Sequence, residues 1–567
     1  MLNKEYITID GIPVEIEGEK NLLEVIRKAG IKLPTFCYHS ELSIYGACRM
    51  CMVETDKGGM EAACSTPPKA GMVIRTNTER LRRYRKMILE LLLSNHCRDC
   101  TTCHNNGACK LQDLAMRFGI DRVRFPNMAA EPKLDESSLC ITRDEHKCIL
   151  CGDCVRMCNE VQQVGAIDFA HRGAKMTIST AFAVPLSESP CVGCGQCAAA
   201  CPTGAIVVKN DAAKVWAALD DPQSKVTVQI APAVRVAVGK ALELPEGANA
   251  IGQIVAALRH MGFDEVYDTA TGADLTVLEE SNELLCRLEK GENEYPLFTS
   301  CCPAWVQFCE KRYPQLMPHV STCRSPMEMF AAVIKASSVN SSRKAVHVAV
   351  MPCTAKKFEA AREEFKADGI PYVDYVITTQ ELVRMVKESG IVFHELEPEA
   401  VDMPFAYKTG AGVIFGATGG VTEAVLRRLS SDKSATALKA LAFQGVRGLA
   451  GVKECTVPYG DRMLKIAMVS GLGNAVGLIE RIQAGEHYDF VEVMACPNGC
   501  ISGGGQPFGH AEEHEARYHD LYAADKVSRI KRSEENPLMM ELYNGILKGR
   551  VHELLHVEYP AAKGETV

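Results

Sequence analysis

Cysteines at short, regular spacings are the residues of this chain that point most directly to chemistry. The sequence holds 26 cysteines in 567 residues, and 17 of them lie before residue 202. A chain of this length does not need disulfides to stabilise its core, and closely spaced cysteines in a reducing compartment usually bind metal. The spacing within each group therefore decides between zinc and an iron–sulfur cluster.

An internal repeat is the most specific of these groups. A run of four cysteines occurs twice, and the two runs are offset by 43 residues. This is the bacterial ferredoxin pattern, in which the fourth cysteine of each run binds the cluster of the other run. One predicted [4Fe–4S] cluster therefore has the ligands Cys148, Cys151, Cys154 and Cys201. The second has the ligands Cys191, Cys194, Cys197 and Cys158.

Two further groups precede the repeat. The first consists of Cys37, Cys48, Cys51 and Cys64. Its spacing is close to that of plant-type ferredoxins, with a longer first loop, and it predicts a [2Fe–2S] cluster rather than a zinc ribbon. The second can bind zinc or a [4Fe–4S] cluster, and its place between two ferredoxin-like groups favours the cluster. Its ligands are His96, Cys100, Cys103 and Cys109, with Cys97 as an alternative that the spacing disfavours.

Cysteines in the second half follow short β-rich runs. The runs at 297–300, 345–351 and 490–494 each lead into cysteine, and the run at 226–231 leads into Pro232. Strands that alternate with helices predict parallel α/β layers, in which ligands lie beyond the carboxyl ends of the strands. Five candidates should therefore converge: Cys301, Cys302, Cys353, Cys496 and Cys500. Four thiolates would hold one more [4Fe–4S] cluster, and one of the adjacent pair would remain free as an acid or base.

Three segments around these cysteines resemble the signatures of [FeFe] hydrogenases. They are TSCCPAW at 299–305, MPCTAKKF at 351–358 and ACPNGCISGGGQ at 495–506, and the upstream groups match the accessory domains of large members in order. The resemblance implies an H-cluster, with a cube on Cys302, Cys353, Cys496 and Cys500. Cys500 would bridge the cube to a two-iron unit that carries CO, cyanide and azadithiolate. The cofactors would then be one [2Fe–2S], three accessory [4Fe–4S] and one H-cluster.

The resemblance also implies roles for single residues. Cys301 would pass protons to the bridging amine, and Lys356 would contact a cyanide. The dinuclear pocket would be lined by Pro232, Met351 and Met494. The proton route to the surface would continue through Glu280, Glu283, Arg287 and Ser321. A metal that accepts a hydride beside a poised base is what heterolytic H₂ cleavage requires.

The elements that position these residues form several domains. Two strands at 6–9 and 12–16 flank an Asp-Gly turn, and helices are expected at 22–29, capped by Asn21, and at 78–95, capped by Thr78. The latter helix should carry an apolar stripe of Leu81, Tyr84, Ile88, Leu91 and Leu92. Polar, helix-like residues are expected at 512–532 and an apolar stripe at 538–547.

The expected fold class is an α/β catalytic domain with parallel sheets and a buried H-cluster, preceded by α+β ferredoxin-like domains. The first three domains are a β-grasp [2Fe–2S] domain at 1–79, a His/Cys₃ [4Fe–4S] domain at 80–125 and a double [4Fe–4S] domain at 126–210. The catalytic domain spans 211–510. Residues 511–567 form a segment that, by the resemblance, wraps the catalytic domain like a small subunit.

Composition limits the other functions. The formal charge of −8 argues against a nucleic-acid binder, and no apolar run is long enough to cross a membrane. The N-terminus lacks an apolar signal core, so we expect a cytoplasmic protein. The glycine-rich segment 470–477 resembles a dinucleotide loop, but its third glycine is one place late, which favours close packing. Six cysteines remain as expected packing residues: Cys97, Cys140, Cys286, Cys309, Cys323 and Cys455.

The expected function is reversible H₂ oxidation and proton reduction. The first 200 residues also resemble the large iron–sulfur subunit of respiratory complex I, so a wire subunit is an alternative, and an H₂ sensor is another. The cysteine signatures after residue 298 and the retained proton-route residues favour the enzyme. The alanine at position 304, within the TSCCPAW segment, resembles the residue found in the subgroup that works in NAD(P)-linked or bifurcating complexes. Expected partners are ferredoxin and/or the flavin- and NAD(P)-binding subunits of a hetero-oligomeric complex, together with maturation proteins.

Overall fold

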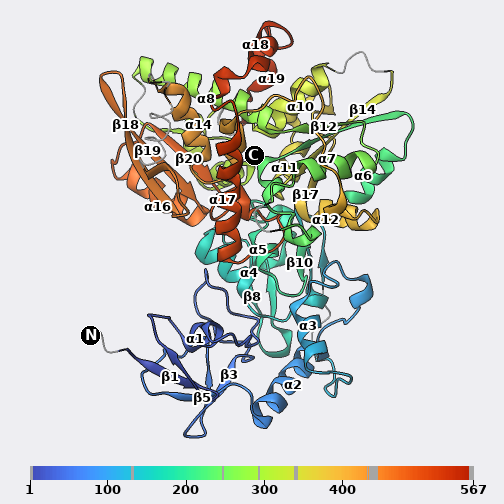
Figure 1. Ribbon diagram of the computed structural model, residues 1–567, viewed down its shortest axis with the longest axis vertical. Helices are drawn as coiled ribbons and strands as arrows, with labels where there is room; N and C mark the ends of the chain where they lie inside the picture. The colour runs from blue at the N-terminus through green and yellow to red at the C-terminus, as the bar shows by residue number, and fades with distance from the viewer. Residues whose placement is uncertain are drawn as a thin grey trace.

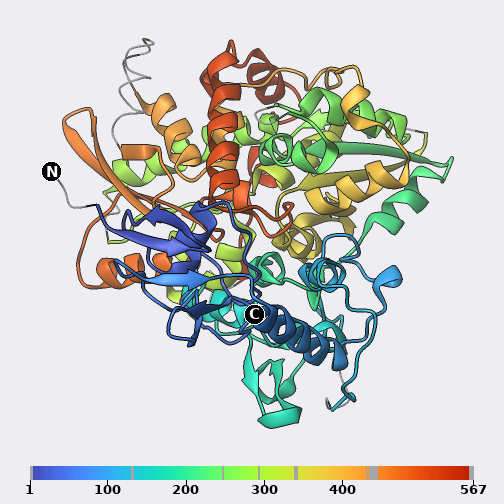
Figure 2. The ribbon, with the colours of Figure 1, turned by 60° about the horizontal axis from the view of Figure 1, so that its bottom comes forward.

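The computed structural model describes residues 4–128, 133–245, 248–291, 294–337, 342–430, 432, 434 and 445–560. The N-terminal, blue residues form the lower part of the molecule in Figure 1. The green to red residues, which include the expected catalytic domain, form the larger upper part, called the catalytic part below. Figure 2 shows the blue N-terminal sheet in front of the catalytic part, and the cysteine repeat lies between them (Figure 1). Within the described residues, no helix is both long and apolar enough to cross a membrane.

A five-stranded sheet begins the chain and confirms the predicted hairpin. β1 (Tyr6–Ile9) and β2 (Ile12–Glu15) pair antiparallel, and both turn residues, Asp10 and Gly11, have positive φ angles, as a type I′ turn requires. The strand order is β2-β1-β5-β3-β4, where the last three are β5 (Val73–Arg75), β3 (Met52–Thr55) and β4 (Met60–Ala62). α1 (Leu22–Lys28) is capped as predicted, since Asn21 Oδ1 accepts the Glu24 N–H at 3.1 Å.

α2 (Glu79–Ser94) follows, and Thr78 caps it through the Leu81 N–H. The predicted apolar stripe is wrong at Leu91, which is 47% exposed, whereas Leu89 is fully buried. The helix buries the face of residues spaced by four, Leu81, Arg85 and Leu89, because the Arg85 guanidinium binds the Met50 and Met52 carbonyls. α3 (Lys110–Arg117) packs beside α2.

The repeat folds as two similar short units. α4 (Asp153–Arg156) and α5 (Gln196–Ala200) each begin after a left-handed glycine, Gly152 and Gly195, and they contact one another. A small sheet joins them in the order β10-β7-β6, formed by β10 (Ile206–Val208), β7 (Ile141–Asp144) and β6 (Leu134–Asp135). β8 (Asp168–Ala170) and β9 (Thr177–Ser179) form a separate hairpin.

Two four-stranded sheets build the catalytic part and confirm the predicted parallel layers. The first, in the order β12-β11-β14-β17, is wholly parallel and consists of β12 (Glu265–Asp268), β11 (Ser224–Ile230), β14 (Lys344–Met351) and β17 (Tyr375–Thr378). The second has the order β13-β20-β19-β18 and consists of β13 (Leu297–Phe298), β20 (Phe490–Met494), β19 (Arg462–Ser470) and β18 (Val452–Tyr459). β18 is antiparallel, which makes this sheet mixed.

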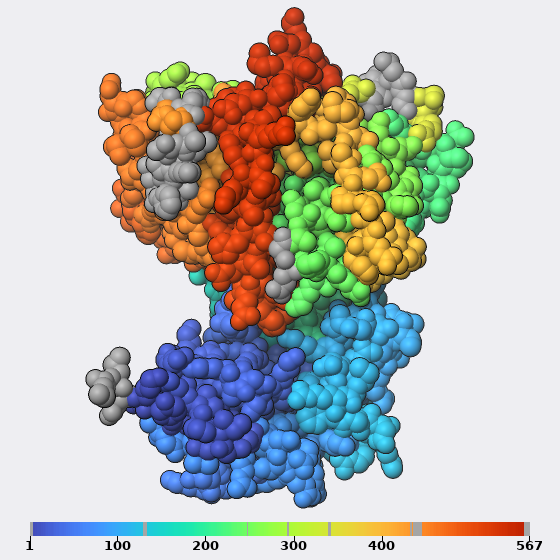
Figure 3. All heavy atoms as spheres, viewed as in Figure 1, coloured from blue at the N-terminus to red at the C-terminus, as the bar shows by residue number. Residues whose placement is uncertain are grey.

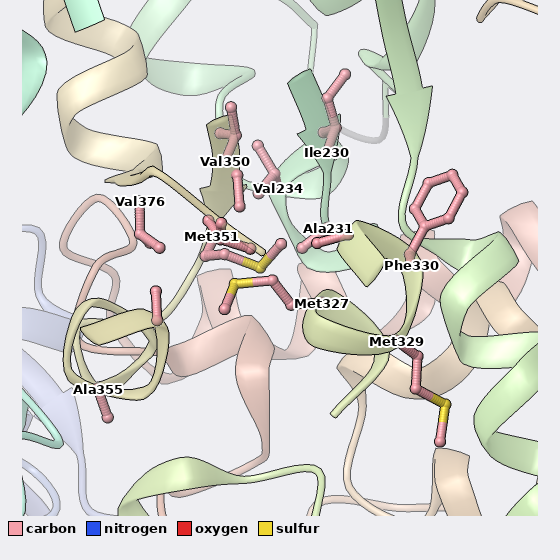
Figure 4. Close-up of a cluster of buried hydrophobic side chains, with 14 of the residues drawn as sticks. Ile230, Ala231, Val234, Met327, Met329, Phe330, Val350, Met351, Ala355 and Val376 are labelled. Carbon is pink, nitrogen blue, oxygen red and sulfur yellow. The ribbon is translucent and has the colours of Figure 1, made fainter. Parts of the chain in front are cut away.

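The helices of this part cover the sheets. They are α6 (Ala212–Leu219), α7 (Ile251–His260), α8 (Ala270–Lys290), α9 (Pro303–Arg312), α10 (Pro326–Ser337), α11 (Ala355–Ala361), α12 (Thr379–Glu388), α13 (Gly410–Val413), α14 (Gly420–Leu429) and α16 (Leu472–Gln483). α8 crosses α10 closely because Gly272 has no side chain, and a Cβ there would lie 2.2 Å from the Pro326 carbonyl oxygen. Figure 4 shows Met351 at the end of β14 and Met327 of α10 pointing toward each other in the core between β11, β14 and α10.

The C-terminal residues cover the catalytic part. α17 (Ala511–Val527) runs along the front of the molecule between the two sheets (Figures 1 and 3), and α18 (Pro537–Asn544) and α19 (Val551–Leu555) follow it. Arg427 of α14 holds α17 through two hydrogen bonds to the buried Asp525 carboxylate, at 3.0 and 2.7 Å. The expected wrapping by this segment is therefore observed for the described residues.

Candidate active site

The carboxyl ends of three parallel strands meet at a cavity of about 90 Å³. β13 leads through two residues to Cys301 and Cys302, β14 leads to Cys353, and β20 leads to Cys496 and Cys500. All five thiols line this cavity. The structure thus brings together the five cysteines that the sequence places after strands, as expected where parallel strands end.

Local structure points backbone donors at these sulfurs. Cys302 is the N-cap residue of α9, and the Ala495 N–H lies 3.4 Å from Cys302 Sγ. N–H groups at a helix N-terminus stabilise a thiolate. Gly499 and Gly503 let the loop after Cys496 pass close to other backbone, since a Cβ on Gly503 would lie 2.2 Å from the Pro352 carbonyl oxygen.

The donor set fits an iron–sulfur cluster. Burial raises the pKa of Cys353 to about 12 and raises the pKa values of Cys302, Cys496 and Cys500 above that of an ordinary thiol. Such thiols need strong positive charge nearby to ionise, and a coordinated metal supplies it. Among the described residues the sulfurs surround the cavity rather than converging on the single point that one metal ion would occupy.

An apolar wall and one buried lysine complete the cavity. Pro232, Met351 and Met494, which the resemblance places beside the dinuclear iron, line it. Lys356 Nζ donates to Glu359 Oε2 at 2.7 Å and to the Cys301 carbonyl oxygen at 3.3 Å. Burial lowers the pKa of Lys356, but the charge and hydrogen bond of Glu359 raise it above the ordinary value. A cation in an otherwise apolar wall suits an anionic ligand such as cyanide.

A set of polar side chains leads away from Cys301. Glu280 is fully buried, its Oε1 accepts the Ser300 N–H at 3.4 Å, and its Oε2 has no hydrogen-bond partner in the described part of the chain. Glu283, one turn further along α8, accepts the Ser321 hydroxyl at 2.6 Å. Arg287 follows after another turn and lies half-buried, within 3.2 Å of His319 Nδ1. The structure therefore places Glu280, Glu283 and Arg287 at successive turns of α8, and the proton route through them stays a prediction.

Burial favours the protonated forms of the Cys301 thiol and of the nearby Glu280 carboxyl. Burial, with a contribution from the Glu283 charge, raises the pKa of Glu280 to about 8. Burial and then the Glu280 charge raise the pKa of the Cys301 thiol well above its usual range. A carboxyl with a pKa near the working pH can both take and give a proton, as a relay group must.

The repeat cysteines surround two smaller cavities, of about 30 and 20 Å³. The first is lined by Cys148, Cys151, Cys154 and Cys201. The second is lined by Cys158, Cys191, Cys194 and Cys197. The fourth cysteine of each run thus faces the cavity of the other run, as the ferredoxin pattern predicts.

The remaining two groups are also assembled. His96, Cys100, Cys103 and Cys109 line a cavity of about 10 Å³, and the buried His96 Nε2 has no hydrogen-bond partner within the described residues. An unpartnered buried nitrogen beside three thiols fits a metal-bound imidazole. Cys97 lines the same cavity and remains an alternative ligand. In the first domain, the Phe36 and Cys48 N–H groups each lie 3.4 Å from a sulfur, of Cys48 and Cys37 respectively.

Close contacts connect these groups into a forked path. A Cβ on Gly504 of the active-site loop would lie 2.6 Å from the Cys194 carbonyl oxygen, and the Thr354 hydroxyl donates to the Gly193 carbonyl oxygen at 2.6 Å. Thr203 lines both the cavity of Cys148 and the cavity of His96. Cys151 packs in one cluster with Cys37. The path from the active site therefore passes both repeat cavities and then divides.

Sequence reasoning missed three features of the site. Glu359 holds Lys356, and both carboxylate oxygens of the buried Glu328 lack a partner in the described residues. The third is the contact of His556 with residue 322. A glutamate three residues after Lys356 on a helix was a usable signal for Glu359. The other two have no local sequence signature.

Two expectations outside the site are also tested. Cys286 is exposed, so the packing interpretation is wrong for it, because α8 turns that position to solvent. The glycine-rich segment at 470–477 joins β19 to α16, and a Cβ on Gly473 would lie 2.6 Å from the Val161 carbonyl oxygen. Close packing against the repeat thus accounts for this glycine, as expected.

Comparison with protein-family models covers most of the chain. A model described as "Iron only hydrogenase large subunit, C-terminal domain" matches residues 224–504, and "Iron hydrogenase small subunit" matches 511–562. "2Fe-2S iron-sulfur cluster binding domain" matches 6–79 and "4Fe-4S dicluster domain" matches 147–205. "NADH-ubiquinone oxidoreductase-G iron-sulfur binding region" matches 85–124.

Individual relatives agree with these matches. The chain is 42% identical to NADP-reducing hydrogenase subunit HndD of Solidesulfovibrio fructosivorans, over 98% of both chains. It is 34% identical to iron hydrogenase 1 of Clostridium pasteurianum, over 98% of this chain and 99% of the relative. A solved structure of a variant of [FeFe]-hydrogenase HydA1 from Chlamydomonas reinhardtii matches with a TM-score of 0.53 and 40% identity, covering 62% of this chain and 98% of that chain.

Proposed function

This chain belongs to the [FeFe] hydrogenase family and is an oxidoreductase that acts on H₂, and we propose that it catalyses reversible H₂ oxidation and proton reduction. One observation carries the proposal. Five cysteines from three strand ends line a single cavity whose other lining residues are apolar except for Thr269 and the buried Lys356 cation. That arrangement suits a sulfur-bound cluster extended by an anionic, dinuclear unit.

We assign the cluster ligands accordingly. Cys302, Cys353, Cys496 and Cys500 would hold the cube, with Cys500 as the bridge to the two-iron unit. When bound, the H-cluster supplies the iron at which H₂ is split. Pro232, Met351 and Met494 would exclude water from that unit, and Lys356 would bind a cyanide.

Protons would travel along the chain's own side chains. The Cys301 thiol would exchange a proton with the Glu280 carboxyl, whose pKa of about 8 keeps it near balance at working pH. Glu283 and the Ser321 hydroxyl, 2.6 Å apart, would carry the proton onward to the half-buried Arg287.

Electrons would use the forked path of cysteine groups. We propose one [2Fe–2S] cluster and three [4Fe–4S] clusters, on the ligands predicted above, within domains at 1–79, 80–125 and 126–210. The catalytic domain would span 211–510 and the small-subunit-like segment 511–567. A fork offers two entry points for partners, which fits a chain that exchanges electrons with more than one protein.

The partner proposal rests on the relatives. One relative is named as the subunit of an NADP-reducing hydrogenase, and the N-terminal residues match a family model of an NADH-ubiquinone oxidoreductase subunit. We propose that flavin- and NAD(P)-binding subunits, or ferredoxin, take up the electrons in the cytoplasm. Maturation proteins would install the dinuclear unit.

An anaerobic infrared spectrum of matured protein tests the proposal, combined with H₂-dependent reduction of methyl viologen. CO and cyanide stretching bands with turnover support an active hydrogenase. Absence of the bands from protein that was matured and still carries its other clusters would overturn the proposal and favour a wire subunit. Bands without turnover would favour an H₂ sensor.

A further inference from the structure

The C-terminal segment is joined to the loop that carries the proton-route serine. Cys323 and His556 form an antiparallel β-bridge. The Val557 N–H donates to the Thr322 carbonyl oxygen at 2.7 Å, and the Arg324 N–H donates to the Leu555 carbonyl oxygen at 2.8 Å. Residues 555–557 thus extend the chain at 322–324 as a short paired strand, more than two hundred residues away in sequence.

The His556 ring is held by two partners. Nδ1 lies 2.8 Å from the Thr322 hydroxyl, and Nε2 lies 3.1 Å from Glu279 Oε2. The Tyr543 hydroxyl donates to the other oxygen of Glu279. Because both ring nitrogens are engaged, the imidazole has one orientation, and it fixes the Thr322 side chain in turn.

Thr322 connects this arrangement to the relay. Its backbone N–H donates to Glu283 Oε1 at 3.2 Å, while the neighbouring Ser321 hydroxyl donates to Glu283 Oε2. The Glu283 carboxylate is therefore held by two consecutive residues, Ser321 and Thr322. The Thr322 side chain is in turn held by His556. Movement of this pair by a fraction of an ångström changes the donor–acceptor distances on which proton transfer depends.

Glu279 is not a competing relay group. Burial raises the pKa of Glu279, but the hydrogen bonds from His556 and Tyr543 lower it below the ordinary value. Its neighbour Glu280 has a raised pKa because it is fully buried, and within the described residues only the Ser300 N–H donates to its carboxylate. Adjacent carboxyls with opposite shifts have separate roles, and Glu279 stays ionised as a fixed partner of the His556 ring.

We propose that His556 is a positioning residue of the proton relay, which holds Ser321 and Thr322 against Glu283 and so lets the C-terminal segment complete the route. The inference rests on the proposed function, because it concerns the same relay. It adds a residue outside the hydrogenase signatures and gives the C-terminal segment a part in proton transfer.

Three variants of the matured, full-length protein test the inference. His556→Ala removes both ring contacts, His556→Gln keeps a donor and an acceptor, and Thr322→Val breaks only the side-chain contact with His556. His519→Ala, at an exposed histidine on α17, is the matched control. Each is assayed for methyl viologen reduction by H₂ in H₂O and in D₂O, and its infrared CO and cyanide bands report how many sites are matured.

We expect His556→Ala and Thr322→Val to lower the rate per matured site about tenfold and to raise the solvent isotope effect about twofold, as proton transfer becomes limiting. His556→Gln should recover the rate to within about threefold, and the control should match the wild type. The inference is overturned if fully matured His556→Ala or Thr322→Val keeps the wild-type rate and isotope effect, or if Gln and Ala are equally impaired. Missing bands or turnover in the wild type would instead refute the proposed function.

Discussion

Replacing Glu280 by glutamine should stabilise the protein at alkaline pH and abolish its proton transfer. Glu280 is fully buried, and one of its carboxylate oxygens has no hydrogen-bond partner in the described residues. Ionisation of that group is therefore poorly compensated, as the raised pKa of about 8 expresses. A glutamine keeps the acceptor for the Ser300 N–H but never carries a charge.

The size of the effect follows from linkage. The carboxyl has an ordinary pKa of 4.5 and a pKa of about 8 in the folded protein. Since the folded protein binds this proton more tightly, its contribution to stability is present below pH 4.5 and is lost as the pH rises through 8. Between pH 5 and pH 8 the wild type loses roughly 4 kcal/mol from this group, at about 1.36 kcal/mol per pH unit. The Glu280→Gln variant loses none of it.

Scanning calorimetry at several pH values measures this difference. A catalytic domain of this size shifts in Tm by roughly 2 °C for each kcal/mol, so the Tm of Glu280→Gln minus that of the wild type should rise by roughly 8 °C from pH 5 to pH 8. Glu289→Gln, an exposed change on the same helix, is the control and should show no such trend. H₂-dependent dye reduction by Glu280→Gln should fall at least about 100-fold.

A Tm difference that does not change with pH would refute the reasoning. It would mean that Glu280 ionises with an ordinary pKa, so that water or another group compensates its charge in the folded protein. A pH-dependent Tm difference with undiminished activity would leave the electrostatics intact and remove Glu280 from the proton route.

Three further predictions follow from other contacts. Gly504→Ala should slow dye reduction at least about tenfold and perturb the electron paramagnetic resonance of the neighbouring cluster, because its Cβ would lie 2.6 Å from the Cys194 carbonyl oxygen; Gly477→Ala, with open space around it, is the control. Arg427→Ala removes the guanidinium that bridges the buried Glu423 and Asp525 and leaves Arg447 as the cation hydrogen-bonded to Glu423, so it should destabilise the protein by about 3 kcal/mol in calorimetry, whereas Lys526→Ala should not. His96→Cys should lower the reduction potential of its cluster in a redox titration, because a thiolate adds negative charge; an unchanged potential would remove His96 from the ligand set.

Local patterns predicted much of the fold and most of the candidate site. Asn21 and Thr78 cap the expected helices, and β20 spans the expected residues, because capping and short apolar runs act over a few residues. The cysteines converge because parallel strands end at one edge, a rule that requires no knowledge of the partners.

The failures concern choices that only tertiary packing makes. Leu91 and Leu89 fit a helical stripe equally well, and the carbonyl groups bound by Arg85 decide which face is buried. Cys286 and Cys323 are both unassigned in sequence, yet one is exposed and the other fully buried. The contact of His556 with Thr322 joins residues 234 positions apart, and no periodicity encodes it.

The contact between Gly504 and Gly195 sets a condition on protein engineering. In a chimera with other ferredoxin-like domains, the two segments that cross at Gly504 and Gly195 must both lack a side chain at that point. A Cβ on either glycine would lie within 3.2 Å of the other segment. Matching the cluster-binding cysteines alone is therefore insufficient for exchanging electron-transfer modules. The active-site loop that carries Gly504 and the cysteine repeat that carries Gly195 therefore have to come from the same parent protein.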